Sequence, residues 1–179
     1  MRSIVIKKQN IAFLGKMNYR PNIEAVNWYL YNVHILLPST YKFIIIGVSP
    51  CQEVINNAKK FSNVEITGFV DDPYKILQEC AVVVAPMQTG GGIQNKVLES
   101  MALGQINILT TKAATPIYGA TNGIHFLVEN DPHLMADLII DILNNRDKYV
   151  HIGNNARQLI KLKYTWKQYE QRLISMLTT

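Results

Sequence analysis

The sequence predicts an α/β fold built on a doubly wound parallel sheet of about six strands. Short apolar runs alternate with longer amphipathic runs along most of the chain, and these two periods are typical of strands and helices. Several short runs, such as residues 42–48, are rich in β-branched residues and apolar on both faces, as in strands that are covered on both sides. Helix-like runs separate the strands, which favours parallel strands joined by crossover helices.

The expected elements follow one another without a break that would separate two domains. The expected strands are residues 11–14, 42–48, 64–67, 81–85, 106–109 and 124–128. The expected helices are residues 21–33, 54–61, 73–80, 97–104, 132–143, 150–161 and 166–177. Asp72 before Pro73 marks one helix start, because proline suits the first helical position and aspartate can cap it. With no internal repeat or linker, we expect residues 1–179 to form a single domain.

Composition limits the classes of function. A hydrophobic fraction of 48% and a charged fraction of 17% are typical of a globular protein. The net charge of +5 is compatible with an anionic ligand, an acidic membrane surface or nucleic acid. Nucleic acid is the least favoured, because the basic residues lack an interleaved aromatic platform. The basic residues near the C-terminus are most simply a solvated helix face.

Cysteine usage and hydropathy indicate the compartment. Cys51 and Cys80 are far apart and lack metal-ligand spacing, which predicts thiols in a reducing compartment and no metal site. No run reaches the roughly 18 apolar residues of a membrane span. We therefore expect a cytoplasmic protein, with peripheral placement at the inner face of the membrane left open.

The segment Thr89-Gly90-Gly91-Gly92, called the glycine loop below, lies between an expected strand and an expected helix. Glycines allow a backbone to approach a ligand closely, and the N–H groups at a helix N-terminus attract anions. Lys96 lies about one turn further on, and Glu99 shares its helix face. This pattern predicts a phosphate site, although a plain turn with a surface Lys/Glu pair explains the glycines alone equally well. The Gly-Lys-Ser/Thr ending of a Walker loop and the dinucleotide fingerprint are both missing.

Residues 86–104, which contain the glycine loop, Lys96 and Glu99, resemble the signature of family 4 glycosyltransferases of the GT-B fold. The similarity is closest to a branch with a triple-glycine loop in bacterial polysaccharide synthesis. Further pieces occur in the expected order, namely residues 13–17, 21–22, 46–47, 67–72, 156–157 and 164–166. The resemblance implies the Rossmann-like, nucleotide-sugar-binding half of that fold, with residues 1–179 as this one domain. It also implies retaining sugar transfer without an obligatory metal or a separate cofactor.

The resemblance assigns roles only to residues that match the family pattern. Glu99 matches the second glutamate of a paired-glutamate motif and would bind the nucleotide ribose. The first glutamate would fall at Gly91, so backbone N–H groups of the glycine loop and the following residue would replace it near the donor sugar. That backbone set is Gly90, Gly91, Gly92 and Ile93.

The remaining assignments concern the diphosphate and the base. Lys16, next to Gly15 after the first strand, matches a basic residue that contacts the diphosphate, and Arg20 lies near the place of a second one. With Lys96 and the loop N–H groups, Lys16 would stabilise the leaving diphosphate. Phe69 and Val70 would flank the base.

The resemblance also defines the expected partners and two alternatives. The partners are a nucleotide sugar and an N-terminal acceptor domain that these residues do not contain. One alternative is a non-catalytic binding or scaffold domain that kept the fold, which the glycine at position 91 makes plausible. The other is half of a sugar-nucleotide epimerase, which would need acid/base carboxylates and histidines around the cleft.

Overall fold

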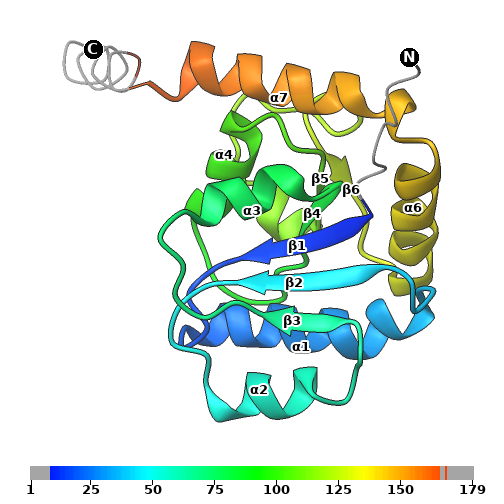
Figure 1. Ribbon diagram of the computed structural model, residues 1–179. Coiled ribbons are helices and arrows are strands. Elements are labelled where there is room, and N and C mark those ends of the chain that lie inside the picture. Colours follow the sequence, from blue (N-terminus) through cyan, green and yellow to red (C-terminus); the bar gives the residue numbers. More distant parts are fainter. Residues whose placement is uncertain (1–8, 166–167, 169–179) are drawn as a thin grey trace.

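The computed structural model describes residues 9–165 and 168, and these form a layered α/β domain (Figure 1). Six parallel strands make one sheet in the order β3-β2-β1-β4-β5-β6. The strands are β1 (Asn10–Leu14), β2 (Lys42–Ile46), β3 (Val64–Ile66), β4 (Val82–Ala85), β5 (Asn107–Leu109) and β6 (Leu127–Val128). The predicted fold class is confirmed.

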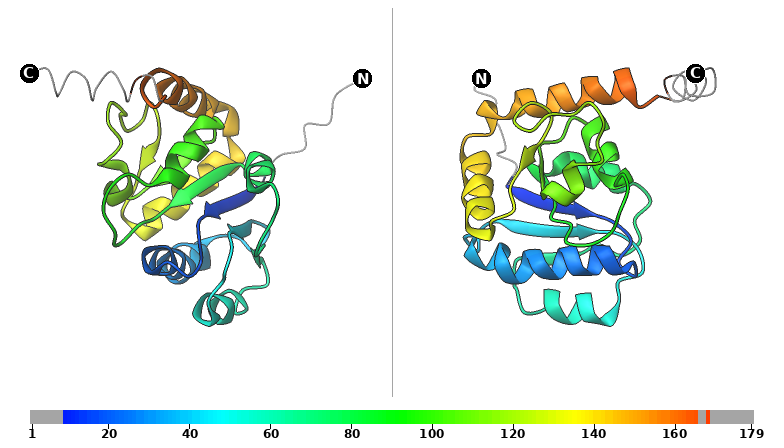
Figure 2. Two further views of the ribbon diagram at one scale, coloured as in Figure 1. Left: turned by 90° about the vertical axis from the view of Figure 1, so that its left-hand side faces the viewer. Right: turned by 180° about the vertical axis from the view of Figure 1, so that it is seen from behind.

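Helices connect the strands and cover both faces of the sheet. They are α1 (Arg20–Asn32), α2 (Gln52–Ala58), α3 (Pro73–Glu79), α4 (Asn95–Ala102), α5 (Thr111–Ala114), α6 (Pro132–Asn144) and α7 (Val150–Lys163), with short 3₁₀ turns η1 (His34–Leu36) and η2 (Arg146–Lys148). The left view of Figure 2 shows the strands between α1 on one side and α3 on the other. No helix within the described residues is long and apolar enough to cross a membrane.

Alternate residues of the strands pack into two different cores. In β1, Ile11 and Phe13 join the larger core, which includes Val26 of α1. Ala12 and Leu14 point the other way and pack with Leu77 of α3. Since both faces of the strand are buried from Ile11 to Leu14, these residues are apolar, which explains the continuous apolar runs in the sequence.

The order of the strands reverses at β1. From β1 the chain passes outward to β2 and β3, and it then returns through α3 to β4 on the opposite side of β1. The loops that leave the carboxyl ends of β1 and β4 therefore diverge to opposite faces, which opens a crevice where ligands bind in doubly wound sheets. These ends lie on the left in Figure 1.

Apart from shifts of a few residues at element ends, two elements differ from the sequence expectation, and one expected helix cannot be compared. The sixth strand is shorter than residues 124–128, because Ile124 is exposed and the Gly123 N–H donates to the Phe126 carbonyl at 2.8 Å in a turn. Helix α5 was not predicted, since four residues are too few to show a helical period. The expected helix 166–177 lies outside the described residues except for Gln168.

The predicted start of α3 is confirmed in detail. The Asp72 carboxylate accepts hydrogen bonds from the backbone N–H groups of Tyr74 and Lys75, each at 3.1 Å. Pro73 occupies the first helical position. This cap fixes the direction in which α3 leaves β3.

Helix α7 packs on the end of α4 at a contact that admits only glycine. A Cβ atom added to Gly153 would lie 2.2 Å from the Gly104 carbonyl oxygen. That separation is far below van der Waals contact, so any side chain at position 153 must push the two elements apart.

We predict that Gly153→Ala lowers the free energy of unfolding by about 1–3 kcal/mol, as is usual for overpacking a close contact. Urea unfolding measures the effect. Asn154→Ala, at the exposed next position of α7, is the matched control and should change stability little. Equal stabilities of the two variants would contradict the account of this contact.

Candidate functional site

A hollow of about 340 Å³ lies where the loops of β1, β2 and β3 meet α3 and α4. Each of these elements contributes residues to its wall. The lining residues are Leu14, Gly15, Lys16, Gly47, Val48, Gly68, Val70, Pro73, Lys96 and Glu99. The hollow thus occupies the crevice that the reversal of strand order opens.

Backbone contacts between two loops build one wall of the hollow. The Gly15 N–H donates to the Ile46 carbonyl and the Met17 N–H to the Val48 carbonyl, both at 2.9 Å. The loops lie so close that a Cβ atom on Gly47 would be 1.8 Å from the Gly15 carbonyl oxygen. Position 47 therefore requires glycine because of this close approach, and the loop that carries Lys16 is fixed at its root.

Lys96 lies in the first turn of α4 and extends toward the start of α1. Its ammonium donates to the Asn22 amide oxygen and lies 3.5 Å from the Met87 sulfur and 5.0 Å from the centre of the Phe13 ring. Burial lowers the pKa of Lys96 from 10.5 to about 8, while the nearby Glu99 charge acts in the opposite direction. An anion that enters the hollow would favour the charged amine and raise this pKa.

Asn22 is a site residue that the sequence reasoning missed. It is buried, and its amide nitrogen donates to the Lys16 carbonyl oxygen at 2.9 Å. One side chain therefore holds both the loop of Lys16 and the amine of Lys96. The sequence shows only an asparagine directly after Pro21 in an expected helix, and neither its burial nor its two contacts can be read from that pattern.

Glu99 lies between Lys96 and Tyr74, a second residue that was missed. Burial raises the pKa of the Tyr74 hydroxyl, and the negative charge and hydrogen bond of Glu99 raise it further. Tyr74 comes from α3 and Glu99 from α4, so the two helices meet at this edge of the hollow. No local pattern in the sequence marks Tyr74, because only the tertiary fold brings it next to Glu99.

The glycine loop lies beside the hollow and is absent from its lining. Gly90 and Gly92 have φ angles of +93° and +71°, a region that glycine adopts at little cost. Gly91 and Gly92 have no atom within 4 Å of where a Cβ would lie. Because α4 begins at Asn95, Lys96 lies closer to the helix start than the expected full turn.

The structure gathers some of the predicted residues and separates others. Those in the lining of the hollow are Gly15, Lys16, Val70, Lys96 and Glu99. Those outside it are Arg20, Phe69, Gly90, Gly91, Gly92 and Ile93. Arg20 pairs instead with Glu24 at 2.8 Å and Glu53 at 3.2 Å, and the Phe69 side chain is 76% exposed.

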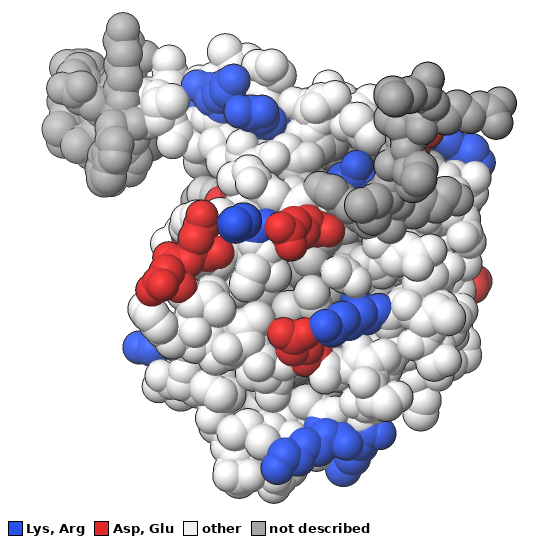
Figure 3. Space-filling model, viewed as in Figure 1, with Lys and Arg blue, Asp and Glu red and all other residues white. Residues whose placement is uncertain are grey.

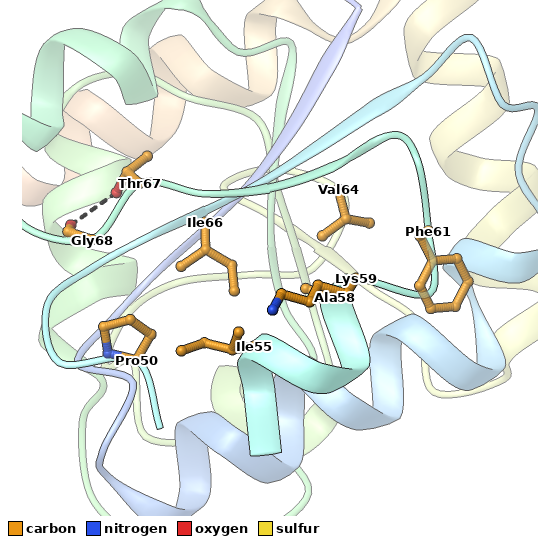
Figure 4. A pocket seen from close by; sticks show the side chains of 9 residues that line it. All are labelled: Pro50, Ile55, Ala58, Lys59, Phe61, Val64, Ile66, Thr67 and Gly68. Atoms are coloured by element: carbon orange, nitrogen blue, oxygen red, sulfur yellow. Dashed lines mark hydrogen bonds between the residues drawn. The ribbon is translucent and has the colours of Figure 1, made fainter. Parts of the chain in front are cut away.

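A second hollow, of about 380 Å³, lies between α2 and the edge strand β3 (Figure 4). Its wall is mostly apolar, with side chains such as Ile55, Phe61 and Val64, and Lys59 is the charged residue in its lining. Gly68 belongs to the walls of both hollows. Since the second hollow contains no carboxylate and no pair of cations, the first is the better candidate for a charged substrate.

Two further observations bear on the classes of ligand. Within residues 9–165 and 168, no group of three or more His, Cys, Asp or Glu side chains could hold a metal ion. On the face shown in Figure 3, basic side chains are interspersed with acidic ones. The described residues of this face therefore do not form the continuous basic stripe that is typical of a nucleic-acid-binding surface.

We predict that an amine of the unliganded chain titrates near pH 8 and that this signal is absent from Lys96→Met. The physical reason is that burial disfavours the charged form of Lys96. NMR of the chain with ¹³C-labelled lysine measures the titration. A Lys96 signal that titrates only above pH 10 would contradict the described environment.

Comparisons with known proteins agree with this fold. The model of the family described as "Glycosyl transferases group 1" matches residues 8–145. An uncharacterized glycosyltransferase of Methanocaldococcus jannaschii, MJ1069, is 25% identical over 177 residues, which cover 90% of this chain and 43% of that protein. An uncharacterized protein in the cps region of Klebsiella pneumoniae is 23% identical over 169 residues, which cover 89% of this chain and 43% of that protein.

Solved structures share the fold at low sequence identity. The S. aureus protein TarM has a TM-score of 0.78 at 18% identity, over 97% of this chain and 36% of TarM. Anabaena HepE in complex with UDP has a TM-score of 0.76 at 12% identity, over 96% of this chain and 49% of HepE. The C-terminal domain of the Francisella tularensis group 1 protein LpcC has a TM-score of 0.66 at 16% identity, over 90% of this chain and 89% of that domain.

The chain thus spans less than half the length of the two relatives that its sequence matches. The family model, in contrast, covers well over half of this chain. The chain belongs to the group 1 glycosyltransferases.

Proposed function

We propose that this chain is the donor half of a retaining glycosyltransferase and binds a nucleoside diphosphate sugar in the hollow at the strand-order reversal. One observation carries the proposal. The half-buried amine of Lys96 and the carboxylate of Glu99 line the same hollow as Gly15 and Lys16. Two cations and one acceptor in a single crevice match the two ends of a nucleoside diphosphate, which are a diphosphate and a ribose with vicinal hydroxyl groups.

The cations would act on the diphosphate. Transfer breaks the bond between the anomeric carbon and the leaving phosphate oxygen, and negative charge develops on that oxygen. Lys16, Lys96 and the N–H groups of the glycine loop would stabilise this charge. Because Asn22 and the Phe13 ring already hold the Lys96 amine in place, little reorganisation is needed when the substrate enters.

The other end of the hollow would hold the nucleoside. Glu99 would accept hydrogen bonds from the ribose hydroxyls, with Tyr74 beside it. Val70 lines the hollow, and the exposed Phe69 ring next to it is available to a base. The complexes of HepE with UDP and with UDP-glucose, and of TarM with UDP, support this class of ligand through the shared fold.

The acceptor would be bound by another part of the protein. The match to nearly all of a C-terminal domain in LpcC supports assigning residues 1–179 to the corresponding half. We propose that the complete protein adds sugars in polysaccharide or glycoconjugate synthesis, in the cytoplasm or at the inner face of the membrane. The nucleotide sugar is then the substrate, and no separate cofactor is proposed.

A non-catalytic binding domain is the second candidate, and Gly91 is the observation that favours it. A Cβ atom at this position would meet no atom within 4 Å, so the fold leaves room for a glutamate here. The chain therefore lacks the first glutamate of the family motif although nothing in the structure excludes it. A thermal-shift screen with UDP, GDP, ADP and their sugars tests this candidate, since a ligand of the folded chain raises its apparent stability. Failure of every nucleotide to do so would favour a scaffold domain that kept only the fold. An epimerase is disfavoured, because the lining of the hollow includes one carboxylate and no histidine.

We predict that Glu99→Ala lowers the affinity for a nucleoside diphosphate by about 1–3 kcal/mol, as expected for a lost hydrogen bond to a charged group. Isothermal calorimetry measures the change. Glu79→Ala removes an exposed carboxylate from α3 and serves as the control with unchanged affinity. If Glu99→Ala binds as tightly as the wild type, the ribose role is refuted.

We also predict that the purified chain binds a nucleoside diphosphate or its sugar but transfers no sugar. The reason is that the hollow contains groups for the donor and no evident general base. A radiolabelled-sugar transfer assay with candidate acceptors tests this. Robust transfer by residues 1–179 would show that the acceptor site lies within the chain.

A further inference from the structure

The first half of the segment between β4 and α4 is held by two neighbouring elements. The Thr110 hydroxyl, directly after β5, donates to the Met87 carbonyl oxygen at 2.8 Å. The Thr89 hydroxyl donates to the Glu24 carboxylate of α1. Gly90 lies against Pro21, since a Cβ on Gly90 would be 3.4 Å from the Pro21 Cβ. The root of the glycine loop is therefore fixed against α1.

Within the described part of the chain, the tip of the glycine loop makes no comparable contact with another element, and its hydrogen bond is local, from the Gln94 amide nitrogen to the Gly92 carbonyl oxygen at 3.4 Å. Gly91 and Gly92 are exposed, and neither has an atom within 4 Å of a Cβ position. The glycine loop thus combines a held root with an open tip, whose N–H groups are accessible to a ligand.

Glu24 is itself held by a series of contacts that reaches α2. Arg20 donates to Glu24 at 2.8 Å and to Glu53 at 3.2 Å, and Asn27 donates to Glu53 at 2.6 Å. The hydrogen bonds from Thr89 and Arg20 lower the pKa of Glu24, in that order of importance. Glu24 consequently stays ionised and keeps its place as an acceptor for the Thr89 hydroxyl at neutral pH.

We propose that Glu24 and Thr89 are a positioning pair that fixes the glycine loop for the phosphate end of the nucleotide sugar, with Arg20 as its anchor. The inference rests on the proposed function and adds residues that it does not use. Arg20 then acts through Glu24 instead of touching the diphosphate. A loop that is fixed before the ligand arrives loses less conformational entropy on binding than a mobile one.

The pair makes a specific prediction for a series of nucleotides. Thr89→Val removes the hydroxyl with little change in size and no change in charge. We expect it to weaken UDP binding by about threefold to tenfold, the range for one lost hydrogen bond, and to leave UMP binding unchanged. Calorimetry with UDP and UMP, and with the GDP/GMP and ADP/AMP pairs in parallel, measures both affinities.

Thr89→Ser restores the hydroxyl and should restore the affinity for the diphosphate. Glu24→Gln, at the surface of α1, is the second variant and should weaken diphosphate binding in the same direction. Equal loss of diphosphate and monophosphate affinity in Thr89→Val would indicate a general structural effect and would overturn the proposal. Unchanged diphosphate affinity would overturn it too.

The anchor role of Arg20 is tested by a double-mutant cycle. If Arg20 acts through Glu24 and Thr89, then Arg20→Gln combined with Thr89→Val binds no more weakly than the weaker single variant. Additive losses would show that Arg20 contacts the ligand independently. A wild-type chain that binds no nucleoside diphosphate overturns the proposed function and this pair together. A wild-type chain that binds one, with Thr89→Val unaffected, overturns the pair alone.

Discussion

The hydrogen bond between the Lys96 ammonium and the Asn22 amide bridges the crevice of the sheet. Asn22 belongs to the helix that follows β1, and Lys96 belongs to the helix that follows β4. These are the two strands from which the chain diverges, so this contact links the two halves of the fold across the crevice, in addition to the β1–β4 pairing and the Thr89–Glu24 hydrogen bond. Asn22 also holds the Lys16 loop. The shape and the charge of the candidate site both depend on this amide.

This arrangement places a cation where water is scarce, and that has a thermodynamic consequence. In the folded chain Lys96 has a pKa of about 8, below the 10.5 of an ordinary lysine. Between these values the unfolded chain binds more protons, so the contribution of Lys96 to stability increases as the pH rises through this window. Below about pH 8 the half-buried charge of Lys96 opposes folding. A bound diphosphate would reverse this cost, which couples the stability of the domain to its ligand.

The sequence predicted the fold well because the sheet is buried on both faces. Apolar runs such as residues 42–48 have few alternatives to a central strand. The pair Asp72-Pro73 is a recognisable signal for a helix N-terminus. Elements that lack a period were not predictable, namely α5 and the turn that shortens β6. For the site, local motifs identified Lys96 and Glu99. The partners Asn22 and Tyr74 come from other helices and are brought in only by tertiary packing. Arg20 was expected to bind the diphosphate because it lies close in sequence to Lys16. It does not line the hollow, so closeness in sequence was misleading here.

The central claim is that the nucleotide occupies the hollow at the reversal of strand order, and not the apolar hollow beside α2. The most direct measurement is the mapping of backbone amide NMR shifts of the labelled chain on titration with a nucleoside diphosphate. The account predicts that the largest changes occur in the loops after β1, β2 and β3, in the glycine loop and in the first turn of α4. Changes centred on Ile55, Phe61 and Val64, or no changes at saturating nucleotide, would contradict it.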